Sequence, residues 1–147
     1  MVFAHTANYH DSASYLEGID LDIYHIKDEG EPWTSKTKER LLAIKSAAAN
    51  IDGHTLEFYR KKLLESSATD KILLYYTDGA MPMENYTEEL EILKREITYC
   101  KRDNITLLGV GIGTNSPVAH GLDTVQVDDS SGIINVVTHL AKRLGIR

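Results

Sequence analysis

Short apolar runs alternate with helical patterns along the chain, which is typical of a mostly parallel sheet flanked by helices. Residues 71–76 carry the strongest run, and its unbroken apolar character predicts a central strand buried on both faces. Residues 105–112 predict a second buried strand, and residues 124–127 a short third one. The pattern therefore predicts an α/β fold, a Rossmann-like three-layer sandwich in a single domain covering residues 1–147.

The N-terminal part predicts two further strands. Residues 2–7 form the first, and residues 21–26 alternate apolar and polar side chains as a half-exposed edge strand does. The connection over residues 8–18 is too short and irregular for a crossover helix, so the two strands are expected to pair antiparallel. The predicted sheet is thus mostly parallel, with one antiparallel edge strand.

Four segments have helical periodicity. A helix is expected over residues 34–49, a second from about Gly53, a third over residues 87–102, and a fourth at the C-terminal end. The apolar side of the first comprises Leu41, Leu42, Ile44 and three alanines. The stripes of the other three comprise Leu56, Tyr59 and Leu63; then Leu90, Leu93, Ile97 and Cys100; then Ile133, Val136, Val137, Leu140 and Leu144.

Charge and cysteine content narrow the possible partners and the compartment. Sixteen basic and twenty-two acidic residues give a net charge of -6, which repels phosphate backbones and argues against nucleic acid as a partner. The single cysteine, Cys100, cannot form an internal disulfide, so we expect a reducing compartment and a core role for its side chain. No signal-peptide pattern or membrane-length apolar stretch occurs, so a cytoplasmic protein without membrane contact is expected.

Candidate metal ligands fall where parallel strands end, because loops and helix N-termini converge there. Asp78 directly follows the strongest strand, and Asn50 and Asp52 lie at the break between the first two helices. Carboxylate and amide oxygens suit a hard cation such as Mg²⁺. Each residue also has a structural interpretation, Asp78 as a turn residue and Asp52 as a helix N-cap.

Two enzymatic interpretations find little support. Gly109, Gly111 and Gly113 lie at alternate positions, whereas the dinucleotide fingerprint Gly-x-Gly-x-x-Gly needs its third glycine one residue later. No phosphate-loop Lys-Ser/Thr pair occurs either. No serine lies in a Gly-x-Ser-x-Gly elbow, and the six histidines are scattered. The sequence therefore predicts no catalytic residues.

Three stretches together resemble one known family. Ile-Leu-Leu-Tyr-Tyr-Thr-Asp-Gly at 72–79 and Leu-Leu-Gly-Val-Gly-Ile-Gly at 107–113 look like the second half of a von Willebrand factor A domain. With Asn-Ile-Asp-Gly at 50–53, the resemblance is closest to the C-terminal A domain of the aerobic cobalt chelatase subunit of cobalamin biosynthesis, and it spans residues 2–144.

The resemblance implies a metal-ion-dependent adhesion site. Asp78 matches that site's aspartate, Asn50 lies at the position of its threonine, and Asp52 is two residues further on. The family's Asp-x-Ser-x-Ser stretch does not occur, since Ala13 and Tyr15 replace the serines after Asp11. Residues 2–7 would then match the family's second strand. This implies an N-terminally incomplete domain whose exposed sheet edge favours a homo-oligomer.

The function implied by the resemblance is a metal-ion-dependent protein-interaction module. Such a module would be a non-catalytic adaptor subunit acting with an AAA+ ATPase and a chelatase-type partner in cobalamin biosynthesis. It would bind Mg²⁺ weakly through an incomplete site. The alternative is an ion-free interaction domain that serves another AAA+ ATPase.

Overall fold

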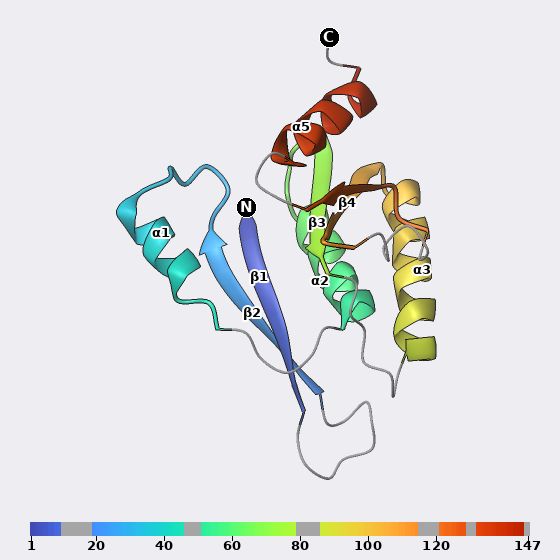
Figure 1. Ribbon diagram of the computed structural model, residues 1–147, viewed down its shortest axis with the longest axis horizontal. Coiled ribbons are helices and arrows are strands. Elements are labelled where there is room, and N and C mark those ends of the chain that lie inside the picture. Colours follow the sequence, from blue (N-terminus) through green and yellow to red (C-terminus); the bar gives the residue numbers. More distant parts are fainter. Residues whose placement is uncertain (10–18, 46–50, 79–85, 115–120, 129–131, 146–147) are drawn as a thin grey trace. The chain divides into compact units, whose positions relative to one another are not determined.

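The computed structural model describes residues 1–9, 19–45, 51–78, 86–114, 121–128 and 132–145 (Figure 1). The chain divides into two compact units, Met1–Ile51 and Asp52–Arg147.

In the first unit, β1 (Val2–Tyr9) and β2 (Ile19–Lys27) form a two-stranded antiparallel sheet. His5 lies opposite Ile23, and the rings of Phe3 and His25 stack with their centroids 4.8 Å apart. The antiparallel pairing predicted from the short connection is therefore confirmed.

The helix of this unit, α1 (Ser35–Leu42), is shorter than the predicted helix over residues 34–49. It begins at a capping box, in which the Thr34 side chain accepts from the Thr37 backbone and the Thr37 hydroxyl accepts from the Thr34 backbone. Ala43 is its C-cap. Residues 46–50 lie outside the described part, so the last positions of the predicted helix are not compared.

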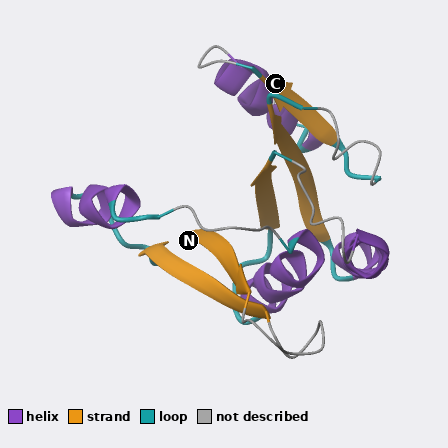
Figure 2. Ribbon diagram, turned by 60° about the horizontal axis from the view of Figure 1, so that its bottom comes forward, coloured by secondary structure: helices purple, strands orange, loops and turns teal. Residues whose placement is uncertain are grey.

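The second unit contains a parallel sheet with the strand order β3-β4-β5. β3 (Lys71–Thr77) pairs with β4 (Ile105–Ile112), and β4 pairs with the short β5 (Thr124–Val127). The helices α2 (Asp52–Leu64), α3 (Tyr86–Arg102) and α5 (Gly132–Arg143) flank this sheet, as Figure 2 shows. The predicted α/β class is therefore confirmed.

Side-chain alternation along β4 separates two apolar layers, because successive residues of a strand point to opposite faces. Leu108 and Val110 pack against Val136 of α5, together with Leu74, Val125, Val127 and Leu140. On the other face, Leu107 lines a pocket with Ile97 of α3, whose neighbours Leu93 and Cys100 are buried. The buried stripe of α3 agrees with its predicted apolar face.

Three burial predictions are wrong. Leu41 and Leu42, on the expected apolar side of α1, are 46% and 84% exposed. β3 was expected to be central, but among the described strands β4 is its one hydrogen-bonded neighbour, so β3 is an edge. Residues 72–74 are consequently only partly buried, and Tyr76 is 51% exposed. In α5, Val136 and Val137 are predicted to share one buried stripe. Val136 faces the sheet, but Val137, about 100° further round the helix, is exposed.

Within the described segments, no helix has the length and apolar character that crossing a bilayer requires.

Candidate functional site

The predicted site residues that the structure describes meet at the carboxyl end of β3. This strand ends at Thr77, and the exposed Asp78 follows it directly. Asp52 is the first residue of α2, and its side chain reaches β3. The helix start and the strand end therefore lie together, as expected from the way parallel strands gather loops at one edge.

Two hydroxyl groups of β3 hold the Asp52 carboxylate. The Tyr75 hydroxyl donates to Oδ1 over 2.9 Å, and the Thr77 hydroxyl donates to Oδ2 over 3.1 Å. Tyr75 and Thr77 are two positions apart in a strand, so both side chains point to the same face. Asp52 itself is 1% exposed. Each of its oxygens thus accepts a bond from the sheet, and the helix start is fixed to β3.

Burial makes the charged form of this carboxylate costly. Loss of solvent raises the pKa of Asp52, the bonds from Tyr75 and Thr77 oppose that rise, and the negative charges of Asp78 and Glu89 add to it. The pKa of Tyr75 is also raised, first by burial and then by the charge of Asp52. Two other carboxylates therefore act on the buried carboxylate of Asp52 at this edge of the sheet.

Glu89, in the first turn of α3, is the second buried acid of this group. Its Oε2 accepts from the backbone N–H of Gly53 over 2.9 Å and from that of His54 over 3.4 Å. Its Oε1 pairs with His54 Nδ1, and this bond is the main cause of the raised pKa of His54. Glu89 therefore satisfies free N–H groups in the first turn of α2, which a helix start otherwise leaves without partners.

Gly53 allows α2 and α3 to approach each other this closely. A Cβ atom at this position would lie 2.6 Å from the Glu89 carbonyl oxygen and 2.9 Å from the Ile92 Cβ. Both distances are far inside van der Waals contact. The glycine after Asp52 is therefore required by helix packing, which explains its place beside the site.

Two of the three predicted site residues lie within the described part of the chain, and they differ in burial. Asp52 and Asp78 come to the same edge, and Asn50 lies outside the described residues. Asp52 is buried with its carboxylate bonded to β3, so it orients the Thr77 hydroxyl rather than facing solvent. Sequence reasoning missed Tyr75, although its spacing of two from Thr77 on a strand was a usable signal.

The described residues at this edge offer a hard cation few oxygen ligands. Asp78 offers an exposed carboxylate, and the Thr77 hydroxyl beside it is held by Asp52. Within the described residues, no group of three or more His, Cys, Asp or Glu side chains is placed to hold a metal. Mg²⁺ keeps several waters and binds through one or two carboxylates, so this donor set suits Mg²⁺ better than a metal that needs a closed protein cage.

Two other sequence features have structural explanations. Gly109 and Gly111 lie inside β4, and a Cβ at Gly109 would lie 2.8 Å from the Thr124 hydroxyl, so this glycine allows the chain around β5 to approach. Cys100 is fully buried, and burial raises the pKa of its thiol to about 11, as expected for a core residue.

No protein-family model, curated protein or solved structure matches this chain. The chemistry of the residues at the carboxyl edge of β3 and the resemblance of the sequence motifs are therefore the indications of its function.

Proposed function

We propose that this chain is a divalent-cation-dependent protein-interaction module that binds Mg²⁺ at the carboxyl end of β3. One observation carries the proposal. The buried carboxylate of Asp52 is bonded to Tyr75 and to Thr77, the residue that precedes Asp78, and the charge of Asp78 acts on it, so that two negative charges share the edge where ligands bind in parallel sheets. A cation at this edge offsets the repulsion between the two carboxylates.

Each residue has a separate role in this proposal. Asp78 supplies the direct carboxylate ligand, because it is the exposed acid of the group. Asp52 acts through Thr77, since its Oδ2 fixes the direction of the Thr77 O–H and leaves the oxygen lone pairs facing away from the carboxylate. A bound Mg²⁺ supplies positive charge and open coordination positions, which suit an acidic side chain of a partner protein.

The partner class follows from the resemblance of the motifs at 50–53, 72–79 and 107–113 to the cobalt chelatase A domain. We propose a cytoplasmic adaptor that acts with an AAA+ ATPase subunit and a chelatase-type partner in cobalamin biosynthesis, without catalysis of its own. The net charge of -6 agrees with a protein partner rather than nucleic acid.

An ion-free interaction domain serving another AAA+ ATPase is the second candidate. The observation that favours it is the small ligand set, since no group of three possible metal-binding side chains occurs in the described residues. In that case Asp52 and Asp78 would shape the edge of the sheet without a cation.

Binding of the purified AAA+ subunit of a cobalt chelatase tests the proposal. The unaltered chain, Asp78→Asn and Asp70→Asn are each immobilised, and the affinity of the ATPase for each is measured in Mg²⁺ buffer. Asp70 lies just before the other end of β3 and is also exposed, so it is a matched control for loss of one surface charge. Because Mg²⁺ also affects the ATPase, the comparison between the variants is more informative than removal of the ion.

We expect Asp78→Asn to weaken binding at least tenfold and Asp70→Asn to leave it unchanged. Equal binding by all three proteins would support the ion-free candidate. Failure of the unaltered chain to bind would refute the proposed ATPase partner.

A further inference from the structure

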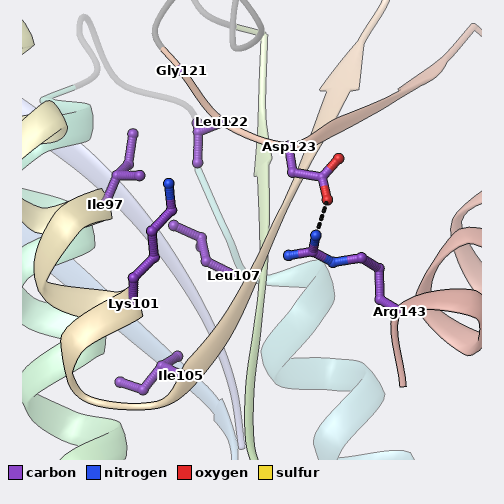
Figure 3. A pocket seen from close by; sticks show the side chains of 8 residues that line it. All are labelled: Ile97, Lys101, Ile105, Leu107, Gly121, Leu122, Asp123 and Arg143. Atoms are coloured by element: carbon purple, nitrogen blue, oxygen red, sulfur yellow. Dashed lines mark ion pairs between the residues drawn. The ribbon is translucent and has the colours of Figure 1, made fainter. Parts of the chain in front are cut away.

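A pocket lies at the other end of the parallel strands from Asp78 (Figure 3). Ile105, the first residue of β4, pairs with the first residue of β3, whereas Thr77 pairs with Gly111 near the far end. β5 pairs with β4 only from Gly109 onward. Beside the start of β4, residues 121–123 therefore run where a longer strand would lie, and they leave a cavity of about 150 Å³.

The wall of this pocket is aliphatic and its rim is charged. The aliphatic side chains come from α3, from β4 and from the segment before β5, namely Ile97, Ile105, Leu107 and Leu122. All four are buried residues. The charged residues are Lys101 near the end of α3, Asp123, and Arg143 at the end of α5.

The charges on the rim do not balance. Arg143 pairs with Asp123 Oδ2 over 3.2 Å, and His139 Nε2 lies 3.2 Å from Asp123 Oδ1, so both oxygens of Asp123 are engaged. Lys101 has no ion-pair partner within the described part of the chain, and Figure 3 shows its ammonium group extending toward Leu122. Two cationic side chains and one carboxylate thus line a pocket in a protein whose net charge is -6.

The size of the cavity limits the ligand. The pocket has room for an apolar body of about six carbon atoms, because an enclosed apolar cavity of about 150 Å³ holds a benzene molecule. We propose that this pocket binds a small monocarboxylic acid. Its carboxylate pairs with Lys101, and its apolar part packs against Ile97, Leu107 and Leu122. This site is separate from the cation site and does not depend on the proposed function.

Titration of the complete ¹⁵N-labelled chain with hexanoate, followed by NMR, tests the proposal. We expect saturable shifts of the backbone amides of Leu107, Leu122 and Asp123, at about millimolar affinity. Affinity should rise with each methylene from acetate to hexanoate, by at most about fourfold per step, because a fully buried methylene contributes about 0.8 kcal/mol. Benzoate should bind at the same amides.

Two comparisons make the test specific. Lys101→Met keeps the length of the side chain and removes its charge, and it should weaken hexanoate binding about tenfold. Lys94→Met is the matched control, because Lys94 is an exposed lysine on the same helix and does not line the pocket. Hexanol has the same apolar body without the charge and should bind at least tenfold more weakly than hexanoate.

Three results would overturn the proposal. These are shifts confined to amides outside the pocket, equal affinity for hexanol and hexanoate, and equal hexanoate affinity of Lys101→Met and Lys94→Met. Tighter binding of hexanoate than of hexanol, weakened by Lys101→Met and not by Lys94→Met, would establish the carboxylate site.

Discussion

Removing one hydroxyl group from β3 tests whether Asp52 is held by the sheet as the structure indicates. Tyr75→Phe deletes the donor that lies 2.9 Å from Asp52 Oδ1 and leaves the ring in place, so it opens almost no cavity. A hydrogen bond to a charged group contributes about 1.5–3 kcal/mol, and Asp52 has no access to water that could replace the donor. We therefore expect the free energy of unfolding to fall by about 1.5–3 kcal/mol.

Urea unfolding followed by circular dichroism measures this change. Tyr76→Phe is the matched control, because Tyr76 is the next residue of the same strand and is 51% exposed. Its free energy of unfolding should stay within about 0.5 kcal/mol of the unaltered chain. In the Asp52→Asn background, Tyr75→Phe should cost less than in the unaltered chain, because the charged acceptor is gone. Equal stability of Tyr75→Phe and Tyr76→Phe would refute the bond between β3 and α2.

Four further predictions concern the scaffold and the site. Arg60→Met should lower the free energy of unfolding by about 3–5 kcal/mol, because the buried carboxylate of Glu96, 2.7 Å from Arg60 Nε, loses its main partner. The double variant Arg60→Met with Glu96→Leu buries no unpaired charge at this position, so it should recover most of the lost stability in the same urea assay. Gly53→Ala should cost about 1–3 kcal/mol by thermal unfolding, since its Cβ would lie 2.6 Å from a backbone oxygen. Asp78→Ala should change the free energy of unfolding by less than about 1 kcal/mol, because an exposed residue leaves no cavity, and a larger loss in urea would show a structural role. Burial lowers the pKa of His5 below its usual 6.5, so the unfolded chain takes up this proton first and the contribution of His5 to stability should fall as pH drops through about 6.5. The raised pKa of His54 acts in the opposite direction, so the measurement is the difference in urea midpoint between the unaltered chain and His5→Phe. That difference should move in favour of His5→Phe as pH falls.

Local patterns carry most of the information about the elements of this fold. The run at 105–112 and the stripe of Leu93, Ile97 and Cys100 predict β4 and α3 closely, because buried strands and amphipathic helices have distinct periods. The apolar run at 71–76 predicts a strand but not its place in the sheet. An edge strand with large apolar residues has the same local sequence as a central one, and only strand order separates the two.

The site is less predictable from sequence than the elements. Asp78 is marked by its place after a strand, and Asp52 by its place at a helix start. Whether a carboxylate is a ligand or a buried anchor depends on which donors face it, and the donors of Asp52 lie 23 and 25 positions away on β3. Glu89 is a stronger example, since its bonds to the first turn of α2 span 35 and 36 positions. No local pattern reports such distances.

The cation site at Asp78 is the central claim, and paramagnetic NMR with Mn²⁺ in place of Mg²⁺ tests it most directly. Mn²⁺ broadens the signals of amides close to it, so the location of the ion is read without a partner protein. We predict that the amides of Thr77, Asp78 and Gly53 broaden first, that excess Mg²⁺ restores them, and that Asp78→Asn removes the effect while Asp70→Asn does not. Broadening that begins elsewhere in the chain, or that persists unchanged in Asp78→Asn, would contradict the account.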